Sequence, residues 1–435
     1  MRILIVAFEY PPLNSGGSRR PQRIARGLHQ REHDVVVWSA DYSGTALATK
    51  CDPISTEEAF PVIHIPLEKE GLRFRWHGKG YSFEPDGMWS LWQNGLSRQW
   101  QSLIQSTEKP DVILLTVPPF SAFRFAHWVK RDTSIPLVVD MRDHWSLWIM
   151  TPYASRIHYH VTKSRERALL STADEVLVVT PVMRDDLLRA HPALDESKVH
   201  VVTNMLPAVP QQMAMPASQS LRIGYFGAFY YFPQIAQEAA KPWYRRAPYR
   251  WGLFYPRRED WKYRSPYFFL KAMAKFLKEH PQQRSHTELV FAGAKPSWFD
   301  AMVSESGLSD CVTHLGNLSA EMALEEQQKC DYLLLTSVKV EDGKDYCIAG
   351  KTFEFFASGK PIIGCVTEGA QRDILVRSGM AVCIDPDDIA ASASTLHALF
   401  SRKTDLAPDP EFLRQFSENA VMNQLLEIIQ RHCAH

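Results

Sequence analysis

The chain has 435 residues, too many for one compact core and typical of two domains of about 200 residues each. Its 49 Lys and Arg residues balance its 49 Asp and Glu residues, which excludes a global charge that would recruit nucleic acid or an anionic membrane. Its seven cysteines are odd in number and show no Cys-x-x-Cys spacing, so they indicate reduced thiols in a cytoplasmic protein.

Apolar, β-branched runs alternate with helical stretches along the first half of the chain. The predicted strands are 3–8, 34–38, 61–66, 111–116, 136–140, 175–180 and 199–203. Continuous hydrophobic strands that alternate with helices are typical of a parallel sheet covered on both faces. The first run is too short for a signal peptide or a membrane helix. We therefore predict a Rossmann-like domain over residues 1–205.

A second series of strands follows a stretch of different composition. Residues 206–220 are rich in proline, glutamine and small residues, which favours a linker. The strands predicted after it are 221–226, 288–292, 312–315, 331–336, 361–364 and 381–384. The predicted fold class is thus α/β, with two doubly wound Rossmann-like domains, 1–205 and 221–409, facing a central cleft. The C-terminal helix, 410–435, is a candidate to cross back to the first domain.

Two stretches interrupt the alternation of strands and helices. Residues 68–95 are irregular, and we expect a loop over the cleft. Residues 231–265 form an insertion in the second domain, with eight Lys or Arg, three acidic and ten aromatic residues. Two interpretations stay open. The insertion either contacts an anionic membrane or a lipid-linked acceptor through its aromatic and basic side chains, or packs on the second domain and forms internal ion pairs.

The most informative motif is residues 350–361, which read Gly-Lys-Thr-Phe-Glu-Phe-Phe-Ala-Ser-Gly-Lys-Pro. Gly350 opens a turn, the next backbone N–H groups at Lys351 and Thr352 point toward an anion, and the Lys351 charge holds a phosphate. Glu354, one turn further along, is placed to accept ribose hydroxyls. The alternative is an ordinary capped helix before a buried strand.

This dodecamer resembles the nucleotide-sugar site of retaining glycosyltransferases of family 4, whose typical form reads Gly-Lys-x-x-Glu-Tyr-x-Ala-x-Gly-Lys-Pro. The resemblance implies the two-domain fold called GT-B and transfer of a hexose, with retention, from a nucleoside diphosphate sugar to a glycan or lipid-linked acceptor. It implies no metal and no other cofactor, because helix dipoles and cations stabilise the leaving group. The implied setting is synthesis of bacterial surface polysaccharide or glycoconjugate, in the cytoplasm or at the inner face of the plasma membrane.

Three glycine-containing turns extend the resemblance on the donor side. Gly16 and Gly17, after a Pro-Pro pair, resemble the family's Pro-Pro-x-x-Gly-Gly loop, although a simple strand-to-helix turn is an alternative. Gly227 resembles the glycine that lies near the donor diphosphate, and Leu318 the residue that contacts the nucleobase. The family's Arg and Lys after Gly227 are absent here. A leaving diphosphate needs cations, and the candidates are Arg264, Lys262, Lys351 and Arg258.

The predicted strand 136–140 leads into Asp-Met-Arg-Asp-His-Trp, residues 140–145. This resembles a subgroup of the family with Asp-x-Arg-Asp-x-Trp at this strand end. The resemblance implies Asp143 as the acceptor-facing base or hydrogen-bond partner, with Arg142 as its ion-pair partner or a sugar contact. His144 is either a catalytic histidine or a packed side chain.

One departure from the family concerns the first of two acids eight residues apart, because Tyr346 stands in its place. Two other functions stay open, and the first of them is suggested by Tyr346 and by the missing Arg after Gly227. One is a degenerate glycosyltransferase-like subunit that only binds a partner or glycan. The other is a nucleotide-sugar epimerase or a phosphorylase on the same two-domain plan.

Overall fold

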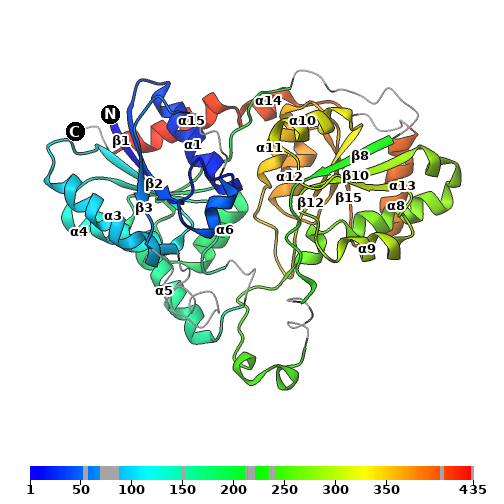
Figure 1. Ribbon diagram of the computed structural model, residues 1–435, viewed down its shortest axis with the longest axis horizontal. Coiled ribbons are helices and arrows are strands. Elements are labelled where there is room, and N and C mark those ends of the chain that lie inside the picture. The colour runs from blue at the N-terminus through cyan, green and yellow to red at the C-terminus, as the bar shows by residue number, and fades with distance from the viewer. Residues whose placement is uncertain are drawn as a thin grey trace. The chain divides into compact units, whose positions relative to one another are not determined.

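The computed structural model describes residues 1–51, 57–68, 88–147, 152–210, 213, 221–234, 237, 241–401 and 406–432. The chain divides into two compact units (Figure 1). The first comprises Met1–Met205, Ala247–Pro256 and Glu418–His435, and the second Leu206–Arg246 and Arg257–Ser417. Each unit has a parallel sheet with helices on both faces, so the predicted α/β fold class is confirmed.

The sheet of the first unit has seven strands in the order β3-β2-β1-β4-β5-β6-β7, and every neighbouring pair is parallel. They are β1 (Arg2–Ala7), β2 (Asp34–Asp41), β3 (Val62–Pro66), β4 (Val112–Val117), β5 (Leu137–Met141), β6 (Glu175–Val178) and β7 (Val199–Val201). The central strands are buried along their length, as their continuous apolar runs require. The order reverses between β1 and β4, and ligands of such sheets bind outside the strand carboxyl ends at this point.

The helices of the first unit include one from the end of the chain. They are α1 (Gly16–His29), α3 (Met88–Gln105), α4 (Phe123–Asp132), α5 (Arg156–Thr172), α6 (Pro181–Ala190) and α15 (Glu418–Gln430), with 3₁₀ turns at Ala46–Lys50, Phe120–Ala122 and Glu196–Lys198. Helix α15 packs on α1 (Figure 1), where a Cβ on Gly27 would lie 2.9 Å from Met422 Sδ. Glycine therefore permits this close approach. The predicted loop 68–95 is wrong from Met88 onward, where α3 begins, and its residues 69–87 lie outside the described part of the chain.

The sheet of the second unit has six parallel strands in the order β11-β10-β8-β12-β14-β15. They are β8 (Leu221–Phe226), β10 (Thr287–Ala292), β11 (Val312–His314), β12 (Tyr332–Thr336), β14 (Ile362–Cys365) and β15 (Ala381–Ile384). The helices are α8 (Tyr267–Glu279), α9 (Phe299–Ser306), α10 (Ala320–Lys329), α11 (Gly350–Ala357), α12 (Ala370–Arg377), α13 (Ile389–Phe400) and α14 (Pro410–Arg414), with a 3₁₀ turn at Pro281–His286.

The predicted insertion 231–265 differs from its sequence interpretation, because its middle belongs to the first unit. It contains short 3₁₀ turns at Trp243–Arg245, Pro248–Arg250 and Trp261–Arg264, and β9 (Glu259–Asp260), which pairs antiparallel with β13 (Lys339–Val340). Phe254 forms an antiparallel bridge to Tyr153 of the first unit, with N–O distances of 3.0 and 2.9 Å. This backbone pairing holds residues 247–256 there.

The predicted linker also differs at its start. Leu206 is buried in a core of the second unit, and its N–H donates to Phe416 O at 2.7 Å. Residues 211–212 and 214–220 of this stretch lie outside the described residues. Among the helices in the described ranges, none is long and apolar enough to cross a bilayer.

Candidate functional site

The N-terminus of α11 lies in the second unit and presents backbone donors. Its capping residue, Ala349, has no side chain that accepts a hydrogen bond. Gly350 is exposed, and no atom lies within 4 Å of the position that a Cβ would take there. The first N–H groups of a helix lack intrahelical partners and carry the positive end of its dipole. The start of α11 is therefore suited to an anion such as a phosphate.

Lys351 adds a cation at this helix start. Its Nζ donates to the carbonyl oxygen of Phe226 at 3.2 Å and lies 3.6 Å from the centre of the Tyr225 ring. Burial, followed by repulsion from Arg264, lowers the pKa of Lys351 to about 7. Gly227 has a φ of +134°, and a Cβ there would lie 3.2 Å from Lys351 Nζ. Glycine at position 227 thus fits both the backbone conformation and the space beside the ammonium group.

Arg264 is the second cation, and its charge contributes to the lowered pKa of Lys351. Burial lowers the pKa of Arg264, but Cys347 and Asp345 outweigh burial and raise it above its ordinary value. The buried Asp345 carboxylate accepts the N–H groups of Cys347 at 2.9 Å and Val338 at 3.2 Å. Within the described part of the chain, no hydrogen-bond partner reaches the buried Nε of Arg264. A guanidinium group fixed in this way remains charged.

The other predicted donor residues have different surroundings. Glu354 is partly exposed on α11 and raises the pKa of Lys351, so it lies near the same site. Leu318 follows Gly316 after β11 and packs partly against a hydrophobic core. Thr352 is fully buried, and its hydroxyl donates to Gln371 Oε1 at 3.0 Å. The Thr352 hydroxyl thus fixes the start of α11 to Gln371.

Gly293 was not predicted, yet it shapes the strand ends of the same unit. Gly227 N–H donates to Ala292 O at 2.8 Å, and Gly293 N–H donates to Gly316 O at 2.7 Å. A Cβ on Gly293, whose φ is +132°, would lie 2.5 Å from the carbonyl oxygen of Gly227. Glycine lets the ends of β8 and β10 approach this closely. The signal in the sequence was a glycine directly after a predicted strand.

The two glycines at the start of α1, in the first unit, have different roles. A Cβ on Gly17 would lie 1.7 Å from Glu9 Oε2 and 2.0 Å from Arg142 Nη1. A Cβ on Gly16 would meet no atom within 4 Å. Ser15 caps the helix and donates its hydroxyl to Glu9 Oε2 at 2.8 Å. Gly17 thus makes room for Glu9 and Arg142, while Gly16 leaves open space.

Arg142 is fixed by three contacts at the carboxyl end of β5. Its Nη2 donates to Pro118 O at 2.8 Å, its Nη1 lies 3.5 Å from Glu9 Oε2, and its backbone N–H donates to Val117 O at 3.0 Å. Asp143 follows directly and is partly exposed. The structure thus brings Arg142, Asp143 and Gly17 to one edge of the sheet. Glu9 was missed, although an acid at the end of the first strand was a signal for it.

His144 does not lie at the surface of this edge. Its side chain is fully buried, and its Nε2 lies 3.5 Å from Asp186 Oδ2 of α6. These surroundings favour the packed side chain, one of the two roles that the sequence allows for His144. Asp140 is buried as well, where Arg20 binds it through Nε and Nη2 at 2.9 and 2.7 Å. This ion pair joins α1 to β5 inside the unit.

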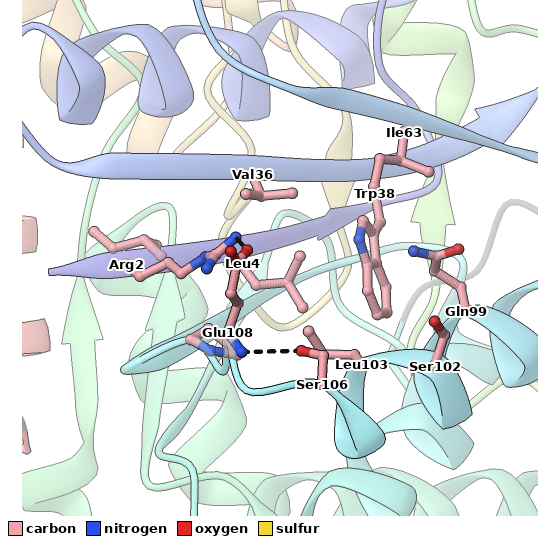
Figure 2. A pocket seen from close by; sticks show the side chains of 12 residues that line it. Arg2, Leu4, Val36, Trp38, Ile63, Gln99, Ser102, Leu103, Ser106 and Glu108 are labelled. Atoms are coloured by element: carbon pink, nitrogen blue, oxygen red, sulfur yellow. Dashed lines mark hydrogen bonds and ion pairs between the residues drawn. The ribbon is translucent and has the colours of Figure 1, made fainter.

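A cavity of about 210 Å³ in the first unit is separate from the predicted residues. Figure 2 shows Arg2 and Glu108 together in its wall, with Trp38 and Gln99 further along. Its lining comes mainly from β1, β2 and α3 and includes none of the predicted site residues. Arg2 and Glu108 lie at the amino ends of β1 and β4 and form an ion pair of 2.8 Å. The cavity is therefore not the candidate site.

The described residues offer no cluster of metal ligands. Within them, no group of three or more His, Cys, Asp and Glu side chains is arranged to hold a metal ion. An Asp-x-Asp pair, Asp385 and Asp387, follows β15. Asp387 accepts a hydrogen bond from Lys339 Nζ at 2.6 Å, and Asp385 accepts the N–H of Asp387 at 2.9 Å. These contacts account for both carboxylates as parts of the fold.

Comparison with known proteins gives a partial sequence match. Residues 15–205 match the family described as the glycosyl transferase 4-like domain. A stretch of 78 residues is 36% identical to alpha-maltose-1-phosphate synthase of Mycolicibacterium smegmatis, covering 18% of this chain and 20% of that protein. The chain therefore aligns with about a fifth of the length of this curated relative.

Solved structures match over the whole chain. Sucrose-phosphate synthase from Thermosynechococcus elongatus has a TM-score of 0.62 at 11% identity, over 100% of this chain and 99% of that chain. HepE from Anabaena, in complex with UDP and glucose, has a TM-score of 0.59 at 12% identity, over 99% of this chain and 100% of that chain. The fold of the chain is thus GT-B, the fold of these solved structures.

Proposed function

We propose that this protein transfers a sugar from a nucleoside diphosphate sugar to a hydroxyl acceptor, with retention of configuration and without a metal ion. The observation that carries the proposal is the start of α11, which has no side-chain cap at Ala349 and has the Lys351 and Arg264 cations nearby. The N–H of Thr352 already donates to Ala349 O at 2.9 Å, so Gly350 and Lys351 supply the backbone donors. A departing nucleoside diphosphate gains negative charge in the transition state, and fixed donors aimed at that charge lower the barrier. This helix start has the chemistry that such a leaving group needs.

Each donor residue has a distinct role in this proposal. Lys351 and Arg264 neutralise the diphosphate, and Gly227 lets it approach the end of β8. Glu354 accepts the ribose hydroxyls, one turn from the anion site. Leu318 contacts the nucleobase. The resemblance to family 4 adds retention, in which the leaving phosphate helps to deprotonate the acceptor on the same face of the sugar.

The acceptor side centres on Asp143. In the proposal, its carboxylate accepts a hydrogen bond or a proton from the attacking hydroxyl. Arg142 is already committed to Pro118 and Glu9, so it acts mainly to hold the strand end in place. Gly16 leaves the open space in which an acceptor or the donor can approach the start of α1.

The acceptor in this proposal is a lipid-linked glycan for surface polysaccharide or glycoconjugate synthesis at the inner face of the plasma membrane. Support comes from residues 241–258, which contain six Lys or Arg and no acidic residue. Trp243, Tyr244 and Trp251 in this stretch are 61%, 60% and 50% exposed. Exposed aromatic rings beside cations favour the interface of an anionic membrane. The alternative of internal packing applies to Phe254 and to Arg257, which pairs with Glu259.

A thermal-shift screen tests the donor site. UDP, GDP and ADP and their sugars are each added to the protein, because a ligand of the native state raises the melting temperature by mass action. We expect one nucleotide series to stabilise the wild-type protein, and Arg264→Met to lose that shift. If no nucleotide sugar raises the melting temperature, the donor assignment is wrong.

A second candidate function is a binding subunit without turnover. The observation that favours it is Tyr346, which is buried with the Arg257 guanidinium 5.5 Å from its ring centre, where the family has an acid. Such a subunit binds the nucleotide sugar and leaves it intact. Consumption of the bound sugar therefore separates the two functions, and it also separates transfer from epimerisation.

A further inference from the structure

In the turn after Asp143, the N–H groups of Trp145 and Ser146 bind one side chain and their C=O groups bind another. Glu166 Oε1 accepts the N–H groups of Trp145 and Ser146 at 3.3 and 3.2 Å. The Tyr153 hydroxyl lies 3.3 Å from the carbonyl oxygen of Trp145 and 3.1 Å from that of Ser146. A hydroxyl has one proton to donate, so these two carbonyls share it. The N–H and C=O groups of this buried turn are thereby all engaged.

Tyr153 is in turn held by the insertion. Its backbone N–H and C=O groups pair with those of Phe254, at 3.0 and 2.9 Å. The Phe254 ring lies 5.0 Å from the ring of Tyr159, which lies 5.5 Å from the Tyr153 ring. A Cβ on Gly252 would lie 3.0 Å from Ala154 O, so the two segments are in close contact. All of these residues belong to the first unit.

We propose that Tyr153 is a positioning residue for Asp143 and that residues 247–256 of the insertion fix its place. The inference rests on the acceptor role of Asp143 in the proposed function. Asp143 lies between two fixed segments of the chain. Before it, Arg142 donates to Pro118 O. After it, residues 145–146 are hydrogen-bonded to Tyr153 and Glu166. Loss of the Tyr153 hydroxyl releases two carbonyls of that turn. The Asp143 carboxylate then samples positions away from the acceptor hydroxyl, and a displacement of this kind is costly for catalysis.

The Tyr153 phenol is protonated at physiological pH and can therefore donate, and burial reinforces this state. Burial, with a smaller contribution from the Glu166 charge, raises the pKa of Tyr153 well above its ordinary value. Glu166 itself is bound to the N–H side of the turn and to His191 Nε2 at 2.8 Å. The carboxylate and the phenol therefore serve opposite sides of the same turn, and neither replaces the other.

The test compares Tyr153→Phe with Tyr159→Phe. Both variants keep an aromatic ring in the same cluster, but only the first removes a hydrogen bond to the turn after Asp143. Turnover is measured as release of nucleoside diphosphate from the nucleotide sugar found by the thermal-shift screen. We expect at least a tenfold lower kcat for Tyr153→Phe with donor KM within twofold, and wild-type kinetics for Tyr159→Phe. Gly252→Val perturbs the contact from the insertion side and is expected to lower kcat with the same unchanged donor KM.

A double-mutant comparison separates positioning from a general structural role. In an Asp143→Asn background, Tyr153→Phe is expected to cause no further loss of kcat, because its effect acts through the carboxylate. Additive losses of kcat in the double variant would overturn the inference. Full activity of Tyr153→Phe, when Asp143→Asn is inactive, would overturn it as well. Full activity of Asp143→Asn would instead overturn the acceptor role in the proposed function. If Tyr153→Phe fails to fold, Gly252→Val and its double variant with Asp143→Asn decide the matter.

Discussion

The lowered pKa of Lys351 predicts that donor binding depends on pH. Burial beneath Tyr225, together with the nearby Arg264, lowers the pKa of this ammonium group to about 7, while Glu354 opposes the shift. At pH 8 the group is then about 90% uncharged in the free protein. A bound diphosphate favours the charged form. Donor binding above pH 7 must therefore take up a proton, and its affinity falls as the pH rises.

The size of the effect follows from linkage. Above pH 7 the affinity is expected to fall by up to about tenfold for each pH unit, or about 1.4 kcal/mol, and to level off below about pH 6. Isothermal titration calorimetry with the nucleotide sugar measures it from pH 6 to 9, because the diphosphate of such a sugar does not titrate in this range. Buffers of different ionisation enthalpy report the proton uptake, which is expected to be about half a proton at pH 7.

Lys351→Arg is the matched control, because a guanidinium group stays charged across this range. Its donor affinity is expected to be independent of pH from 6 to 9. A flat profile for the wild-type protein would refute the reasoning. An equal slope in the Lys351→Arg variant would refute it too, because the titrating group would then be another one.

Three further predictions concern the other elements of the account. Gly17→Ala is expected to lower kcat strongly, because its methyl group would occupy the space of Glu9 and Arg142. The Cβ of Gly16→Ala would meet no atom within 4 Å, so this variant should keep near-normal kinetics. Equal kinetics of the two variants would show that the space beside Gly17 is not needed for activity. Glu354→Ala is expected to weaken nucleotide binding by about 1.5 to 3 kcal/mol, the range for a hydrogen bond to a charged group. The melting temperature of the free protein should change little. An unchanged nucleotide affinity in calorimetry would show that Glu354 does not contact the ribose. Changing Trp243, Arg245, Arg246, Arg250 and Trp251 together should abolish salt-sensitive binding to anionic liposomes and leave the melting temperature unchanged. As a control, alanine at Lys275 and Lys278 of α8 should change neither liposome binding nor melting temperature. A wild-type protein that does not bind such liposomes at low salt would rule out the membrane contact.

The sheets were predictable because their strands are continuous apolar runs. The runs 221–226 and 381–384 coincide with β8 and β15. The predicted strand 34–38 ends three residues before β2 does, and the other predicted strands have ends within two residues of the observed ones. Two-sided burial forces this composition, so the signal lies in each strand itself. The start of α3 was missed because residues 88–95 mix Trp, Asn and Gly, a composition that resembles a loop.

The candidate site was predictable only where a motif carried it. The motif at 350–361 predicted a helix start with Lys351, and the structure has one there. By contrast, residues 247–256 belong to the first unit although the chain on both sides of them belongs to the second. Their place depends on backbone pairing of Phe254 with Tyr153, and such pairing leaves no side-chain pattern in the sequence. The burial of His144 is likewise set by Asp186 of α6, more than 40 positions along the chain. Contacts of this kind depend on the assembled sheet.

The most direct test of the central claim is a time course of the nucleotide sugar by proton nuclear magnetic resonance in the presence of the purified protein. For an α-linked donor, the account predicts slow loss of the donor, release of the nucleoside diphosphate, and first appearance of the free sugar as its α anomer. A donor that is bound but stays intact would contradict the claim and identify a binding subunit. Conversion of the sugar to an epimer, or first appearance of the β anomer, would contradict it as well.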